Sequence, residues 1–123
     1  MLSLPSSVKI FLCLEPADMR RSFDGLFMMT EKLIRQDPFT GHLFVFFNKR
    51  RDRVKILYWD RDGLAIWYKR LEKGTFRFES DGHGGIEIEP GRLLLILEGI
   101  DPAGAKKRKR YSRKAVDERQ ISQ

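Results

Sequence analysis

Four short, strand-like runs follow one another in the middle of the chain, and their spacing restricts the fold more than any other feature. Each run is rich in β-branched, aromatic or other large apolar residues, and each is separated from the next by a short polar or glycine-containing turn. Turns this short join antiparallel neighbours, so the pattern predicts a β-meander. The runs span residues 43–47, 53–60, 64–71 and 75–78.

The flanking segments predict one more strand at the start, a short strand near the end, and two helices. Residues 8–14 are apolar, lie between two prolines and read as a buried strand. From Ser22 to the Asp37-Pro38 pair, apolar residues recur every three or four positions, which indicates an amphipathic helix. After a brief strand at 86–88, Pro90 opens a helix that Gly99 closes, expected to dock through Leu93, Leu94, Ile96 and Leu97.

These elements predict an α+β fold. We expect a mostly antiparallel sheet of four to five strands, two helices packed on one face, and a flexible basic C-terminal tail. The single domain should span residues 1–101. Residues 102–123 contain no Leu, Phe or Trp and should form the tail, because such a segment cannot bury a core.

Charge is the strongest functional signal in the composition. The 123 residues carry a formal net charge of +7, which favours a polyanionic partner such as nucleic acid. No stretch has the length of a membrane span or the layout of a signal peptide, so no membrane partner is expected. The single cysteine, Cys13, reads as a small buried residue and fits a reducing, cytoplasmic location.

Basic residues gather in three places where they could contact phosphates. Arg20 and Arg21 precede the first helix, where they could hold a phosphate or pair with neighbouring aspartates. A second group surrounds the first meander turn, and a third forms the tail. The predicted nucleic-acid contacts are Arg20, Arg21, Lys49, Arg50, Arg51, Arg53, Lys55, Lys69, Arg70, Lys106, Lys107, Arg108, Lys109, Arg110, Arg113 and Lys114.

Trp59 and Trp67 could form a base-stacking or partner surface, or could simply cover the sheet. A catalytic role has weaker support. Asp52, Asp60 and Asp62 form the tightest carboxylate group, but aspartate is also a common turn residue. One cysteine and two separated histidines match no zinc spacing, so we predict no metal, no cofactor and no enzymatic activity.

Two blocks carry a family resemblance: DMRRSFDGL at residues 18–26, and residues 37–78, which contain KILYWDRDGLAIWYKRLEKG. With LLLILEGID at 93–101, they resemble the small accessory protein TnpB of IS66-class insertion sequences. That protein is distinct from the RNA-guided nuclease that shares its name. The resemblance implies a role in DNA transposition beside a separate, larger transposase and another small protein of the same element. It implies no catalytic residue at any position of this chain.

The leading prediction is therefore a non-catalytic accessory factor that contacts DNA, with the element ends as the expected target, and the transposase. One alternative is a protein-protein adaptor for the transposase with no direct DNA contact. Others are a metal-dependent nuclease that uses Asp52, Asp60 or Asp62, and a protein that binds single-stranded RNA through its aromatic sheet. The sequence indicates no particular oligomeric state.

Overall fold

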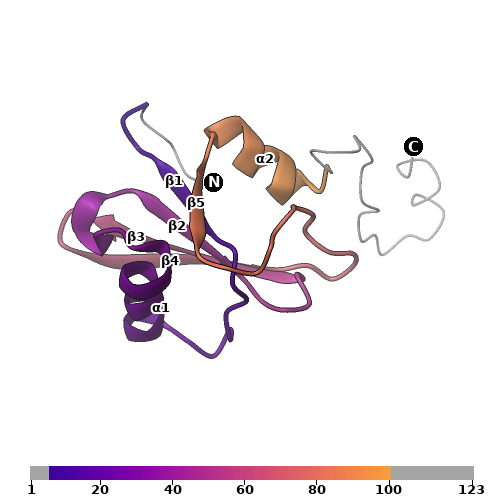
Figure 1. Ribbon diagram of the computed structural model, residues 1–123, viewed down its shortest axis with the longest axis horizontal. Helices are drawn as coiled ribbons and strands as arrows, with labels where there is room; N and C mark the ends of the chain where they lie inside the picture. The colour runs from indigo at the N-terminus through magenta and orange to yellow at the C-terminus, as the bar shows by residue number, and fades with distance from the viewer. Residues whose placement is uncertain (1–5, 101–123) are drawn as a thin grey trace.

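The computed structural model describes residues 6–100, which form one sheet with a helix on either side (Figure 1). Because the tail cations lie outside these residues, their role stays a prediction. In chain order the elements are β1 (Ile10–Cys13), α1 (Phe23–Met29), the π-helical turn η1 (Thr30–Ile34), the 3-10 turn η2 (Pro38–Thr40), β2 (Leu43–Phe47), β3 (Arg53–Asp60), β4 (Gly63–Arg70), β5 (Gly85–Ile88) and α2 (Pro90–Glu98).

The sheet has five strands in the order β4-β3-β2-β1-β5. The meander is confirmed for β2, β3 and β4, which pair antiparallel through short turns. α1 lies on the connection between β1 and β2, so these two strands run parallel, while β5 pairs antiparallel with β1. Three of the four pairings are antiparallel, which confirms the predicted α+β class with a mostly antiparallel sheet.

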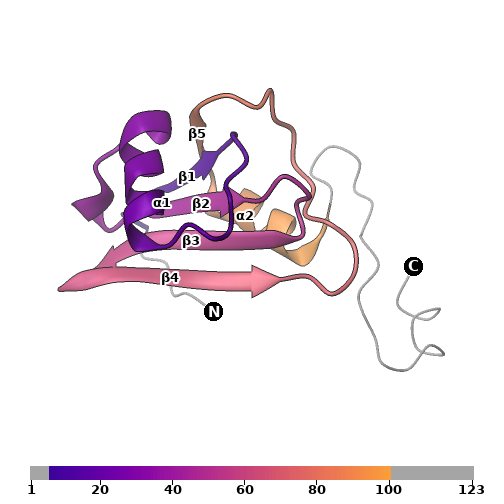
Figure 2. The same ribbon diagram turned by 90° about the horizontal axis from the view of Figure 1, so that it is seen from below.

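The prediction that both helices pack on one face is wrong. Figure 2 shows α1 in front of the sheet and α2 behind it. The reason lies in the central strands, which are apolar on both faces. In β1, Ile10 and Leu12 join the core under α2, whereas Phe11 and Cys13 join the core under α1. Both faces must be shielded from water, so each receives a helix.

Three local predictions also need correction. Residues 75–78 form no strand; Phe76 and Phe78 are buried against the α2-side core by an irregular segment, which Phe76 N–H anchors to the Arg51 carbonyl at 2.7 Å. The first helix is α-helical only to Met29 and continues as η1. On α2, Leu94 is exposed, because it lies outside the buried stripe of Leu93, Ile96 and Leu97.

Candidate nucleic-acid interface

Three loops gather at one end of the sheet because β1, β2 and β4 end there and β3 begins there. They are residues 14–21, 48–53 and 69–84, and Figure 2 shows the loop after β4 beside the β2–β3 turn. Counted with the strand residues at their edges, Arg53 of β3 and Lys69 and Arg70 of β4, these segments contain ten Lys or Arg and six Asp or Glu. At the other end, residues 6–9, 35–42, 60–63 and 89–91 contain three Lys or Arg and four Asp or Glu. The fold therefore separates charge, and we call the first end the basic end.

The β2–β3 turn presents its cations from a well-ordered backbone. The Asn48 amide organises it: its Oδ1 accepts hydrogen bonds from the backbone N–H groups of Asp52 and Arg53, each at 3.0 Å. Its Nδ2 donates to the Asp52 carboxylate at 2.6 Å. Lys49 and Arg50 are exposed at the tip, and no hydrogen bond or ion pair is seen for either side chain within residues 6–100. Their charge is available to a partner.

Shallow depressions flank this turn on both sides. One, toward the loop before α1, is lined by Arg20, Arg50 and Arg53. The other, toward residues 75–79, is lined by Lys49 and Arg77 and by Arg50, which also lines the first depression. Cations from loops distant in sequence thus converge around a single projecting turn. Asp18 and Asp52 share the first depression, and Glu79 shares the second.

Two predicted contact residues at this end, Arg20 and Arg70, are paired with carboxylates in the structure. Arg20 holds Asp18 at 2.6 Å, and this hydrogen bond lowers the pKa of the exposed Asp18 carboxyl to about 2. Arg70 holds Glu72 at 2.8 Å. The alternative that Arg20 pairs with a neighbouring aspartate is thus observed. Because such exposed pairs are weak, they can exchange for a phosphate contact at small cost.

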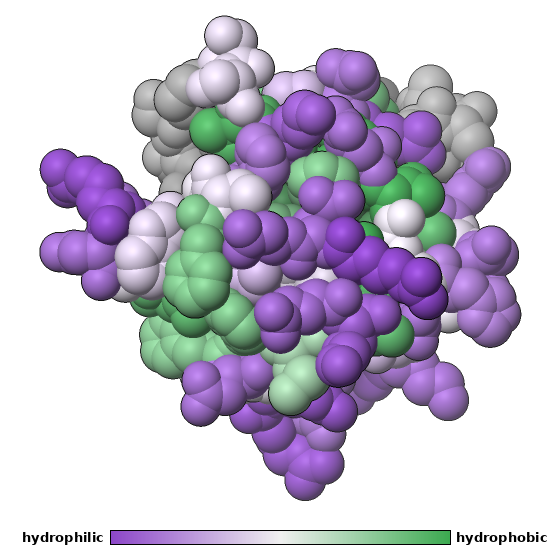
Figure 3. All heavy atoms as spheres, turned by 60° about the vertical axis from the view of Figure 1, so that its left-hand side comes forward, coloured by the Kyte–Doolittle hydropathy of each residue, from purple (hydrophilic) through white to green (hydrophobic). Residues whose placement is uncertain are grey.

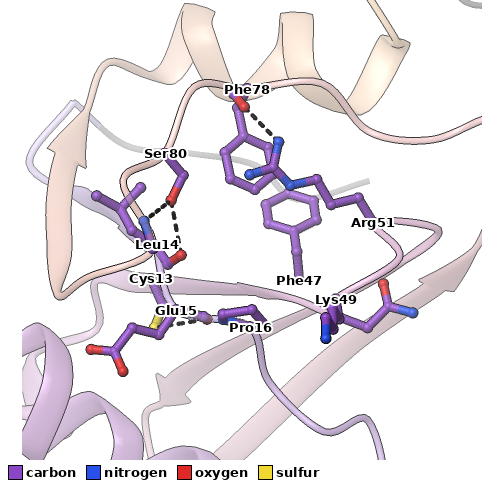
Figure 4. Close-up of a pocket in the computed structure, with 11 residues that line it drawn as sticks. Cys13, Leu14, Glu15, Pro16, Phe47, Lys49, Arg51, Phe78 and Ser80 are labelled. Atoms are coloured by element: carbon purple, nitrogen blue, oxygen red, sulfur yellow. Dashed lines mark hydrogen bonds between the residues drawn. The ribbon is translucent and has the colours of Figure 1, made fainter.

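Arg51 has a structural role that the sequence does not reveal. Its Nη1 donates to the Phe78 carbonyl at 2.6 Å, and its guanidinium lies 3.8 Å from the Phe78 ring centroid. Figure 4 shows this contact at the rim of a pocket between the ends of β1 and β2. Burial lowers the Arg51 pKa from its ordinary value. Arg51 therefore fastens the irregular segment to the turn.

Lys55 differs most from its predicted role. It is buried, with only 7% of its surface exposed. Its ammonium donates to the backbone carbonyls of Met19 and Arg21, both at 2.7 Å, and lies 4.6 Å from the Tyr68 ring centroid. A phosphate cannot approach it without displacing the loop before α1. In the structure Lys55 holds that loop on the sheet, and we therefore propose a structural role for it in place of the predicted phosphate contact.

The two tryptophans do not form one surface. Trp59 lies on the α1 side of the sheet, where its ring meets Phe39 at 5.2 Å, and Phe39 meets Phe27 at 5.3 Å. Trp67 lies opposite Ile56 and packs on the α2-side core. An apolar area is visible on the side of the molecule that carries η2 and the β3–β4 turn (Figure 3), where Phe39 is 54% exposed.

The candidate catalytic aspartates do not converge. Asp52 precedes β3, whereas Asp60 ends it and Asp62 follows in the next turn. Eight strand residues separate Asp52 from Asp60 by about 26 Å. Within residues 6–100, no group of three or more His, Cys, Asp or Glu side chains could hold a metal ion. In the same residues no helix is long and apolar enough to cross a membrane.

Sequence reasoning omitted two residues from the candidate sites. Arg77 lines a depression beside the β2–β3 turn, and the alternation of Phe76, Arg77 and Phe78 was the available signal. Phe39 extends the Trp59 surface, and it had no signal because it lies in a loop between a helix and a strand. Both residues reach their sites through tertiary contacts.

Comparisons with known proteins place the chain in a family context. A family profile described as IS66 Orf2-like protein matches residues 8–107. An uncharacterized protein of Sinorhizobium fredii, y4jC, is 33% identical over 101 residues, covering 82% of this chain and 86% of the relative. A second uncharacterized protein from the same organism, y4hO, is 32% identical over 101 residues, which cover 82% of this chain and 88% of the relative. No solved structure matches.

Proposed function

Since the chain belongs to the IS66 Orf2-like family of insertion-sequence accessory proteins, we propose that it assists DNA transposition without catalysing it and contacts DNA through its basic end. The observation that carries this proposal is the separation of charge by the fold. Lys49 and Arg50 project from an ordered turn, and Arg20, Arg53 and Arg77 line the depressions on either side. Such an arrangement suits a phosphate backbone, which carries closely spaced negative charge.

The proposal assigns contact with the backbone rather than recognition of a sequence. Cations that contact phosphates fix the position of a protein on a duplex but carry no sequence information. We expect the tail cations at 106–110, 113 and 114 to add affinity of the same kind. We also propose that Arg21, Lys69 and Arg70 contribute at the margin of the basic end, and we leave Lys55 out.

Binding to a duplex with the element's terminal repeat, and to a scrambled duplex, tests the proposal across a salt series. Each lost phosphate contact should reduce the slope of log affinity against log salt by about 0.9. The double variant Lys49→Ala, Arg50→Ala should therefore reduce that slope by about 2 and weaken binding to both duplexes equally. Fluorescence anisotropy gives these affinities directly.

A matched control removes the same charges elsewhere. Lys32 and Arg92 are exposed, and neither side chain has a hydrogen bond or ion pair in the part of the chain described. The variant Lys32→Ala, Arg92→Ala should leave the slope within about 0.3 of the wild type. An equal loss in both double variants would mean that net charge matters and the basic end does not. Replacing the tail cations with glutamine separates their share.

The second candidate function is an adaptor that docks on the element's transposase, and the exposed Phe39 ring beside Trp59 favours it. Substituting Phe39→Ser should weaken transposase binding without altering the salt dependence of DNA binding. Leu94→Ser, on the opposite side of the sheet, is the control because Leu94 is equally exposed. If Phe39→Ser leaves transposase capture unchanged, this surface is not the adaptor site.

A further inference from the structure

The edge strand β4 has the properties of a strand that can pair with a further strand on its outer side. It is eight residues long, and its neighbour β3 covers one side only. Figure 2 shows it as the outermost strand of the sheet. Residues 63–67 carry no charge, and half-buried apolar side chains lie on both faces: Leu64 and Ile66 on one, Trp67 on the other. Long apolar edge strands are pairing sites unless charge or cover protects them.

The other edge of the sheet is built differently. β5 has four residues and exposes Glu87, with Glu89 directly after it. Short strands and charged side chains are the usual protection of an edge. The contrast singles out β4 as the edge that can accept another strand.

The direction of the backbone groups on β4 follows from one hydrogen bond. Leu71 N–H donates to the Asp52 carbonyl at 2.7 Å, so the backbone groups of Leu71 face β3. In an antiparallel pair these groups alternate in direction from residue to residue. Those of Leu64, Ile66, Tyr68 and Arg70 therefore point outward, away from the sheet.

We propose that β4 of a second copy of this chain fills this edge, antiparallel and about a two-fold axis at Ile66. The outward residues then form the hydrogen-bonded pairs. In this register Ile66 lies opposite itself, Leu64 lies opposite Tyr68, and Asp62 lies opposite Arg70. Apolar residues thus meet apolar or aromatic ones, and the acidic turn of one copy meets the basic strand end of the other.

Other symmetric registers match less well. A two-fold axis at Tyr68 places Arg70 opposite Ile66 and Glu72 opposite Leu64, so charges face apolar side chains. An axis at Leu64 shortens the paired length, because Asp60 already belongs to β3. Charge complementarity therefore favours the axis at Ile66. The dimer has one ten-stranded sheet, with a basic end at each of its opposite ends.

Sedimentation velocity on the full chain, free of nucleic acid, tests this assignment through a charge exchange. The wild-type protein should form a dimer with a dissociation constant below about 100 µM, in the range of weak specific dimers. Arg70→Asp and Asp62→Arg each place like charges opposite one another at two symmetric positions, so each should weaken dimerisation roughly tenfold or more. The double variant restores opposite charges and should recover the wild-type affinity. Both residues are exposed, so neither change disturbs the core.

A cysteine pair gives a second readout of the register. Residues opposite one another in a hydrogen-bonded pair have Cα atoms about 5.5 Å apart, within reach of a disulfide. Ile66→Cys should therefore form a covalent dimer on oxidation. Ala65→Cys should not, because its side chain lies on the other face and opposite residue 67. A wild-type chain that stays monomeric would overturn the proposal. So would a dimer whose affinity neither charge reversal changes and whose Ile66→Cys variant forms no cross-link.

Discussion

Replacing Lys55 by methionine tests the structural role assigned to its ammonium. Methionine has nearly the same length and volume, so the packing around the side chain is kept. The change removes two charge-assisted hydrogen bonds, to the Met19 and Arg21 carbonyls, and the contact with the Tyr68 ring. Each such hydrogen bond contributes about 1.5–3 kcal/mol, and the released cost of burying the ammonium offsets part of the loss. We expect a net destabilisation of about 2–3 kcal/mol.

Urea and thermal unfolding measure this loss. For a domain of this size, about 2–3 kcal/mol corresponds to a fall in Tm of roughly 10–20 °C. Hydrogen exchange should accelerate first in the loop at 14–22, since Lys55 fastens that loop to the sheet. Lys69→Met is the matched control: Lys69 is an exposed lysine on the neighbouring strand, and its loss should change stability by less than about 0.5 kcal/mol.

DNA binding separates this role from the one expected from sequence. A buried ammonium bonded to two carbonyls releases no counterion when DNA binds, so folded Lys55→Met should keep the wild-type salt slope. Loss of a phosphate contact would instead lower the salt slope by about 1. If Lys55→Met shows that lower slope and is as stable as the Lys69→Met control, then Lys55 does not hold the loop on the sheet.

Two further predictions follow from burial. The Cys13 thiol has its pKa raised by burial to about 11 from an ordinary 9.0, so it should resist alkylation at pH 8 until the protein unfolds, as mass spectrometry would detect. Because the unfolded thiol ionises first, its contribution makes stability fall as pH rises from about 9 to 11, which denaturation curves can follow. Gly85→Ala should cost about 1–3 kcal/mol in urea unfolding, because its Cβ would lie 3.0 Å from two Ile34 methyl or methylene carbons; Gly63→Ala, in open space, should be neutral.

Strand runs and helix limits were predictable where local chemistry dominates. The bounds of β2, β3 and α2 match the expected ranges, because alternation and short turns define the strands, and a proline and a glycine define the helix ends. The expected strand at 75–78 failed for a different reason. Its two phenylalanines are buried as predicted, but the segment bonds to Arg51 instead of joining a strand ladder: Phe76 N–H donates to the Arg51 carbonyl, and Arg51 Nη1 donates to the Phe78 carbonyl.

In the candidate site, too, residue type was predictable from the sequence and the role of each residue was not. A run of cations at 49–55 looks uniform in sequence, yet the fold gives its members three functions. Lys49 and Arg50 are exposed and available, Arg51 fastens a neighbouring segment, and Lys55 is buried under the loop before α1. Sequence spacing cannot separate these roles because they depend on which distant carbonyl lies within reach.

By itself, then, the sequence determined the strand and helix periods, the net positive charge and the family. Those properties depend on residue type and on neighbours a few positions apart. The tertiary structure alone decided which face each helix covers, which cations stay free, and that positive charge collects at one end of the sheet. The physical reason is that burial and hydrogen-bond partners come from residues far apart in the chain: Lys55 meets the carbonyls of Met19 and Arg21 only once β3 has paired and the α1 loop has closed over it.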